Sequence, residues 1–161
     1  MRAFPWLLSV AFAASLACSA CAVRPVHAAT AASGSGPAVT LRGHRFTVEI
    51  ADTVAAREHG LMDRTAMPAD HGMLFVFADA EPRTFWMKNT LIPLDILFFD
   101  SADRLVTIRA DVPPCKTNPC PTYASTAPAR YVLELNAGTA ASIGARKGDL
   151  LGVSGMPSGT Q

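Results

Sequence analysis

This chain of 161 residues has few cysteines, little net charge and few long apolar runs. Each of these features excludes a class of site or function. Only Cys115 and Cys120, of four cysteines, lie beyond residue 21, which is too few for a zinc site built on two cysteine pairs. The net charge of +1 does not give the basic surface of a nucleic-acid-binding protein. The sequence shows no internal repeat or heptad pattern, and no Ser-His-Asp or Cys-His set stands out.

The one long apolar run lies at the N-terminus and predicts a signal peptide over residues 1–28. A basic start at Arg2 precedes an uncharged run over residues 3–23, and the small-x-small sequence VHA at 26–28 is typical of a signal-peptidase site. Its removal leaves 12 basic and 13 acidic side chains, so the mature chain carries a net charge of about −1. We therefore expect an exported protein of the periplasm or cell envelope, with no membrane span after cleavage.

Two other fates of the N-terminus stay open. The apolar run is nearly long enough to remain as a membrane anchor. Cys18 and Cys21 each follow an imperfect lipoprotein box, so a lipid anchor is the second alternative. Beyond the leader, the sequence predicts a flexible tether at 29–43, a single β-rich domain at 44–153 and a C-terminal tail at 154–161. The oligomeric state is left open.

Hydrophobic periodicity predicts a mainly β domain. Short helices are expected at 52–60, capped by Asp52 or Thr53 and ended by Gly60, and at 137–144. About seven short strands carrying two short helices indicate a compact β sandwich or a partly closed barrel. Alternating or continuous apolar segments indicate those strands at 44–51, 72–78, 83–88, 94–99, 104–112, 130–136 and 150–153.

The proline-rich segment 113–128 is expected to form a long loop closed by a disulfide. Cys115 and Cys120 lie in the stretch PPCKTNPCP, where prolines and Asn118 favour a tight turn. An exported protein meets an oxidising compartment, so these two cysteines are predicted to be bonded to each other. A redox-active pair is less favoured, because such pairs are usually separated by two residues rather than four.

Charged residues inside apolar segments point to a candidate site. The stretch RTFWMKNTLIPLDILFFD, residues 83–100, holds Lys88 and Asp95 near its middle. Strand alternation places Trp86 and Lys88 on one face, and the short connection predicts that the two strands are antiparallel neighbours. Lys88 and Asp95 are then expected to meet beside Trp86. Glu134 repeats the pattern as an acid within the apolar strand VLELN.

Two interpretations of these charges stay open. In the first, Arg57 or Arg64 forms a buried ionic network with Asp95 or Glu134, because an isolated interior charge is costly. In the second, the charges line a pocket with a mixed apolar and polar surface, which suits a small polar ligand such as a saccharide or envelope fragment. The second interpretation makes the chain a non-catalytic binding module, and its site residues are Arg57, Trp86, Lys88, Asn89, Asp95 and Glu134.

Two alternative functions use overlapping residues. Asp95 and Glu134 would be the acid/base pair of a hydrolytic enzyme. A periplasmic copper-binding protein is the second alternative, because thioether and imidazole ligands suit Cu(I). Its ligands would come from Met62, Met67, Met73, Met87, His59 and His71, although methionine is also common in cores. The preferred interpretation requires no metal and no cofactor.

Several stretches in this order resemble the domain of unknown function 192 (DUF192) family. They are VEIADTVAAREHGLMDR, GMLFVF, FWMKNTLIPLDILFFD, PCKTNPCPTY and YVLELNAG, which together run from about residue 44 to residue 153. The resemblance implies a compact β sandwich with short helices in a family that is often exported. The family has no established activity, so the resemblance implies a fold and does not imply a function.

Overall fold

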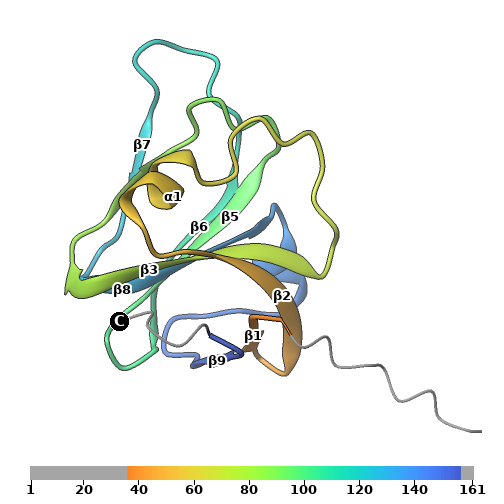
Figure 1. Ribbon diagram of the computed structural model, residues 1–161, viewed down its shortest axis with the longest axis vertical. Helices are drawn as coiled ribbons and strands as arrows, with labels where there is room; N and C mark the ends of the chain where they lie inside the picture. Colours follow the sequence, from red (N-terminus) through yellow and green to blue (C-terminus); the bar gives the residue numbers. More distant parts are fainter. Residues whose placement is uncertain (1–35, 157–161) are drawn as a thin grey trace, which may run out of the picture. The chain divides into compact units, whose positions relative to one another are not determined.

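The computed structural model describes residues 36–156, which form a curled seven-stranded sheet, a two-stranded ribbon and two short helices (Figure 1). The expected signal peptide, Cys18 and Cys21, most of the tether and the end of the tail lie outside the described residues. The elements are β1 (Ala38–Leu41), β2 (His44–Ala51), α1 (Val54–His59), β3 (His71–Glu81), β4 (Thr84–Trp86), β5 (Leu94–Phe99), β6 (Leu105–Val112), β7 (Thr122–Ala124), β8 (Ala129–Asn136), α2 (Thr139–Ser142) and β9 (Leu151–Ser154).

The large sheet has the order β6-β5-β8-β3-β2-β1-β9. Only β2 and β3 pair in parallel, with α1 in the connection between them, and the other pairs are antiparallel. Its two edge strands approach each other at one end, where Arg104 and Leu150 form an isolated bridge and Leu105 N donates to Asp149 O at 2.8 Å. The prediction of a mainly β, partly closed barrel with two short helices is therefore confirmed.

Two strands lie where the sequence predicted none. β1 occupies residues expected in the tether, so the folded domain begins before residue 44. β7 interrupts the expected loop at 113–128 and pairs with β4 to form the two-stranded ribbon. Both strands are only three or four residues long, which is too short for a clear alternation pattern. In the part of the chain that the structure describes, no helix has the length and apolar character to cross a membrane.

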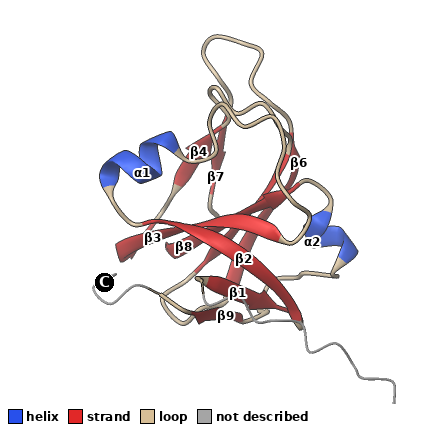
Figure 2. Cartoon of the chain, turned by 45° about the vertical axis from the view of Figure 1, so that its right-hand side comes forward, coloured by secondary structure: helices blue, strands red, loops and turns tan. Residues whose placement is uncertain are grey.

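Helix α1 begins and ends as its sequence predicts. The Thr53 side chain accepts a hydrogen bond from Ala56 N at 3.1 Å, which decides between the two candidate caps. Gly60 has a φ of 52°, a conformation that other residues adopt with strain. Helix α1 lies beside the β4–β7 ribbon, and strands β1 and β9, at one edge of the curled sheet, lie at the opposite end of the view (Figure 2).

Strand β5 is buried along its whole length, because side chains pack against both faces of the sheet there. The alternation expected in β5 is found, and it assigns its side chains to two separate core clusters. We call one surface the Phe98 face, which carries Met73, Phe75, Ile96, Phe98 and Val132. The other is the Leu97 face, which carries Leu74, Leu97, Phe99, Leu133 and Leu135.

The β4–β7 ribbon covers the Phe98 face. Phe85 of β4 packs edge-to-face against Phe75 and Phe98, with ring centroids 4.9 and 5.7 Å apart. Met87, two residues further along and on the same side of the chain, is also buried in this cluster. Because Phe85 and Met87 are buried, the alternate residues Trp86 and Lys88 point outward. These two outward side chains belong to the candidate site described next.

Candidate functional site

Trp86 is held outward on the β4–β7 ribbon. Its neighbour Phe85 points into the core, and Trp86 is 49 % exposed. Trp86 pairs with Thr122 in the ribbon, so both side chains lie on the same face. Arg83 fixes the start of β4, because its Nε donates to Ala129 O at 3.0 Å and its backbone N–H donates to the Ser125 hydroxyl. The exposed indole therefore has a supported backbone beneath it.

A tight turn after β4 presents Lys88 and Asn89. Thr90 N donates to Met87 O at 3.2 Å, and Asn89 has a φ of 56°, in the left-handed region that asparagine tolerates in turns. Asp63 N donates to Asn89 O at 2.9 Å, which ties the turn to the segment that follows α1. The Lys88 ammonium lies 5.1 Å from the centroid of the Trp86 ring, within range of a cation–π interaction.

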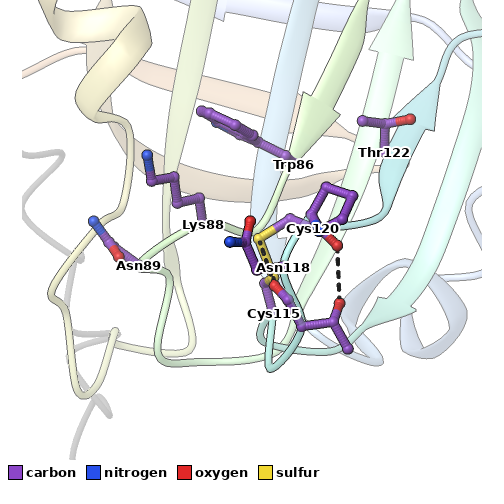
Figure 3. Close-up of a pocket in the computed structure, with 9 residues that line it drawn as sticks. Trp86, Lys88, Asn89, Cys115, Asn118, Cys120 and Thr122 are labelled. Atoms are coloured by element: carbon purple, nitrogen blue, oxygen red, sulfur yellow. Dashed lines mark hydrogen bonds between the residues drawn. A yellow bond between two sulfur atoms is a disulfide. The ribbon is translucent and has the colours of Figure 1, made fainter.

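The predicted disulfide is present and closes one side of a groove. Cys115 and Cys120 are bonded, and Cys115 N donates to Met87 O at 3.4 Å, which holds the loop against the end of β4. Figure 3 shows Trp86, Lys88, Asn89 and Thr122 arranged around the disulfide. The groove has a volume of about 570 Å³, and Thr117, Asn118 and Pro119 of the loop complete its lining.

A second hollow of about 260 Å³ lies on the α1 side of Trp86. It is lined by Val54, Arg57, Glu58, Phe77, Thr84, Phe85 and Trp86. Nη1 of Arg57 donates to Asp52 O and Val76 O, and its guanidinium lies 5.1 Å from the centroid of the Phe77 ring. The guanidinium is therefore fixed between α1 and β3, and Trp86 separates this hollow from the disulfide groove.

Glu134 lies in a small niche beneath Trp86. It is 4 % exposed and sits on the Phe98 face, since it pairs with Met73 of β3 and Ile96 of β5. Burial raises the pKa of its carboxyl to about 8. Among the described residues this carboxyl has no hydrogen-bond or ion-pair partner, and it faces a cavity of about 30 Å³ that Arg57, Trp86 and Thr90 also line. We call this cavity the Glu134 niche.

The arrangement is suited to binding. Trp86 offers an apolar plate, the Lys88 ammonium and the Asn89 amide supply donors, and the hydroxyls of Thr117 and Thr122 supply donors and acceptors. Five of the six predicted site residues lie around Trp86: Arg57, Trp86, Lys88, Asn89 and Glu134.

Asp95 is the exception, and its expected position beside Lys88 is corrected. The sequence predicted that β4 and β5 are antiparallel neighbours, but β4 pairs with β7, and β5 pairs with β6 and β8. The short connection between β4 and β5 crosses from the ribbon into the sheet. Lys88 therefore lies above the Phe98 face, whereas Asp95 points to the Leu97 face.

Asp95 has a structural environment. The residue is fully buried, and its carboxylate accepts hydrogen bonds from three backbone N–H groups. Oδ1 accepts from Asp111 N at 2.9 Å and from Gly138 N at 3.2 Å, and Oδ2 accepts from Ala140 N at 2.7 Å. These donors come from the end of β6 and the start of α2, so Asp95 joins three elements on the side of the sheet away from Trp86.

An acid/base pair of Asp95 and Glu134 is excluded by the sheet register. Asp95 is opposite Leu135, and Ile96 is opposite Glu134. Side chains of directly opposed residues share a face, and successive residues alternate. The two carboxyls therefore project from opposite faces of the sheet and cannot act on one bond.

The expected ionic network is also different. Neither arginine reaches Asp95 or Glu134. Arg64 forms a bidentate pair with Glu49, with N–O distances of 2.5 and 2.6 Å, and His71 Nε2 lies 3.0 Å from the same carboxylate. The Arg64 hydrogen bonds are the main reason that the pKa of Glu49 is lowered. This network is on the protein surface and fixes the segment after α1 to β2.

Three of the four methionines considered as copper ligands, Met67, Met73 and Met87, belong to or pack against the core cluster on the Phe98 face. Met73 and Met87 are buried members of this cluster. Met62 lines the Glu134 niche, and His71 contacts Glu49 and Thr47. Within residues 36–156 there is no group of three or more His, Cys, Asp or Glu side chains arranged to hold a metal ion. The thioethers of Met73 and Met87 act here as core side chains.

Sequence reasoning missed the residues that complete both cavities. Thr117, Asn118, Pro119 and Thr122 enter the groove because the disulfide loop folds back onto β4. The three residues TYA of β7 carried the available signal, since Tyr123 is inward and its neighbours are outward. The pairing of β7 with β4 lies more than 30 residues away in sequence, and no local pattern encodes it.

Comparisons with known proteins give a family and two similar structures. The sequence model of the family DUF192, described as "Uncharacterized ACR", matches residues 38–153. A protein of unknown function from Novosphingobium aromaticivorans DSM 12444 is 37 % identical, with a TM-score of 0.67 over 71 % of this chain and 83 % of its own. A candidate transcription regulator from Sinorhizobium meliloti 1021 is 43 % identical, with a TM-score of 0.67 over 74 % of this chain and 95 % of its own. No curated protein matches the sequence.

Proposed function

The chain belongs to the DUF192 family, which has no established function, and we propose that it binds a small polar ligand against the indole of Trp86. The observation that carries this proposal is a half-exposed tryptophan on a supported ribbon between two hollows. Tryptophan combines a large apolar surface with one polar atom, and it gains free energy when a ligand or partner covers it. The groove volume of about 570 Å³ lies within the ordinary range of small-molecule sites.

The lining favours a ligand with one flat apolar face and hydroxyl or amide groups around its edge. The indole would cover the flat face, and Lys88, Asn89 and Thr122 would supply hydrogen bonds at the edge. A saccharide of the cell envelope has this chemistry. The strongly mixed lining does not favour an entirely apolar ligand, because such a ligand would leave the ammonium and amide without partners.

Export from the cytoplasm is a second part of this proposal. The apolar leader with its VHA site and the disulfide both support a location in the periplasm or cell envelope. The Sinorhizobium relative is described as a candidate transcription regulator. In this chain 14 basic side chains nearly balance 13 acidic ones, which does not favour a DNA-binding surface.

Mass spectrometry of the protein purified from its own cells tests export. We expect a mature chain that begins at residue 29 and carries a disulfide. A chain that retains residue 1, with no modification and with two free thiols at Cys115 and Cys120, would contradict export. An acylated N-terminus at Cys18 or Cys21 would replace soluble export with a lipid-anchored form.

A fluorescence titration tests the binding site. The full chain carrying Trp6→Phe has Trp86 as its sole tryptophan, so its emission reports on this position alone. We expect soluble envelope glycan fragments to change the emission in a saturable manner. Lys88→Ala should weaken binding by about tenfold to a hundredfold, since hydrogen bonds to charged groups are worth roughly 1.5–3 kcal/mol. Lys147→Ala, an exposed lysine that lines none of the described cavities, is the matched control.

A further inference from the structure

The Glu134 carboxyl has no hydrogen-bond or ion-pair partner in the part of the chain that the structure describes, and its oxygens keep a small contact with solvent, since the fully enclosed side-chain atom without a partner there is Arg130 Nε. Glu134 is 4 % exposed, and no donor or cation among residues 36–156 reaches it. Most buried polar groups are hydrogen-bonded, because burial removes their contacts with water. Asp95, on the adjacent strand, shows how this fold satisfies a structural carboxylate, with three backbone donors. Glu134 lacks such donors and faces a cavity, so its partner is expected to come from outside the chain.

The size of the niche limits that partner to one small group. Its volume of about 30 Å³ is sufficient for a group the size of a water molecule or an ammonium. A ring or a carboxylate with its substituents does not fit. The niche opens beside Trp86, which also borders the disulfide groove and the α1 hollow. A ligand that lies on the indole can therefore insert one substituent towards Glu134.

The walls of the niche favour a positive charge. Phe75, Phe85 and Trp86 are among the residues that line it, and aromatic rings can attract cations. The Met62 thioether and the Thr90 hydroxyl are acceptors that also line it. An anionic group would meet the Glu134 carboxyl, whose negative charge would repel it when ionised.

Charged groups near the niche come from α1 alone. They are Arg57, Glu58 and His59, whereas the sheet neighbours of Glu134 are the apolar Met73 and Ile96. The Arg57 guanidinium is directed to Asp52 O and Val76 O and lies against Phe77. Burial, with no contribution from Arg57, accounts for the raised pKa of Glu134. The positive charge that this carboxyl lacks is therefore not supplied by α1.

We propose that the Glu134 niche receives the ammonium group of an amine-bearing ligand, with the Glu134 carboxylate as its counter-ion. This inference rests on the proposed function in one respect, since the rest of the ligand is assumed to lie on Trp86. The carboxyl releases its proton to solvent when the ammonium docks, and the new ion pair replaces the hydration lost on burial. The site thereby selects amino sugars and other primary amines over neutral ligands of the same shape.

Methylammonium tests the niche without any contact to the groove. The carboxyl carbon of Glu134 is followed by NMR through a pH titration of the full chain. We expect the pKa of Glu134, about 8 in the free protein, to fall in methylammonium chloride and to stay unchanged in equal sodium chloride. Tetramethylammonium has the same charge but is larger than the niche and has no N–H donor, so it should have no effect. Equal effects of the three salts would overturn the inference.

The affinity for methylammonium should depend on pH with a slope set by this one group. Below about pH 8 the carboxylate fraction rises about tenfold per pH unit, so the affinity should do the same and then level off. Glu134→Gln keeps the shape of the protonated side chain and should fold, but its affinity should be low and independent of pH. A pH slope that persists in Glu134→Gln would assign the titration to Glu58 or His59 and overturn the inference.

Three sugars that differ in one substituent connect the niche to the groove. Glucosamine, N-acetylglucosamine and glucose carry an ammonium, an amide and a hydroxyl at the same ring position. We expect glucosamine to bind about tenfold or more tightly than the other two at pH 7, where its amine is mostly protonated, and Glu134→Gln to remove this preference. Equal binding of the three sugars, lost in Trp86→Ala, would leave the proposed function intact and overturn the niche. A methylammonium response without sugar binding would support the niche and contradict the proposed saccharide ligand.

Discussion

Asp95 and Glu134 are buried carboxyls on neighbouring strands with opposite surroundings. Asp95 accepts three backbone hydrogen bonds on the Leu97 face, whereas Glu134 has no partner within residues 36–156 and faces the niche below Trp86. The difference follows from the sheet register, which directs the two side chains to opposite faces. A satisfied carboxylate contributes to stability, and an unsatisfied one is available to a ligand.

Replacement of Asp95 is expected to destabilise the protein strongly. Asp95→Ala leaves the N–H groups of Asp111, Gly138 and Ala140 buried without an acceptor. Each unsatisfied donor costs roughly 1–3 kcal/mol, so the free energy of unfolding should fall by about 3 kcal/mol or more. Urea denaturation measures this change, with Asp70→Ala, an exposed aspartate, as control. A loss below about 1 kcal/mol would contradict the structural role of Asp95.

Glu134 should make the stability depend on pH in the opposite sense to an ion-paired acid. Its pKa is 4.5 in the unfolded reference and about 8 in the folded protein, so the folded state binds more protons between these values. The stability it contributes is fully present below pH 4.5 and decreases as the pH rises towards about 8, by at most about 1.4 kcal/mol per pH unit.

Glu134→Gln removes this dependence because glutamine does not ionise. The difference in unfolding free energy between variant and wild type should therefore shift in favour of the variant from pH 5 to pH 8.5, by a few kcal/mol. Chemical denaturation of both proteins across this range measures it, and all other titrating groups cancel in the difference. A difference that does not change with pH would show that Glu134 is ionised at neutral pH.

For single residues, the sequence predicted which side chains share a face of a strand better than it predicted which residues lie next to them in space. Alternation correctly placed Trp86 and Lys88 on one face, because that pattern is local, and the structure shows that the opposite face, with Phe85 and Met87, packs into the core. The neighbours of Asp95 depend on strand order, which residues distant in sequence determine. Thus five of six predicted site residues lie around Trp86, and Asp95 lies on the other face.

The β4–β7 ribbon and the disulfide loop form the site as two connected elements. Phe85 and Tyr123 hold the ribbon on the Phe98 face, and the bond from Cys115 N to Met87 O holds the loop on the ribbon. Helix α1 was predictable from its caps, Thr53 and Gly60, whereas β7 was not, because a three-residue strand has no clear period. Prolines and cysteines identified the loop but did not indicate where it folds back.

Removal of the disulfide should affect binding more than stability. Cys115→Ser/Cys120→Ser opens a short loop, and closing a loop of this length is worth about 2 kcal/mol on the chain-entropy model. The same loop supplies much of the groove lining, so ligands of the Trp86 groove should bind more weakly. Thermal melts and Trp86 fluorescence measure the two effects, with Lys116→Ala as a control within the loop. Unchanged affinity in the double variant would exclude the loop from the site.

At the scale of the whole molecule, the curled sheet has one face that is packed as core and one face that carries the candidate site. The edge strands meet near Arg104 and Leu150, and the Leu97 face is packed with apolar side chains and Asp95. The Phe98 face is covered by α1 and the ribbon, and the three hollows around Trp86 lie on that side. The number and length of the strands predicted the partly closed barrel. Which face of the sheet is packed as core and which carries the candidate site depends on the strand order, which the sequence did not predict.

The central claim is that Trp86 and its surrounding residues form a ligand site, and NMR chemical-shift mapping tests it most directly. The Trp86 indole N–H and the Asn89 side-chain amide of the full chain are observed while an envelope glycan or glucosamine is added. We expect saturable shifts of these two signals and unchanged amides at Asp111 and Ala140, which contact Asp95 on the opposite face. Saturable shifts around Asp95 and α2, with Trp86 and Asn89 unaffected, would contradict the account.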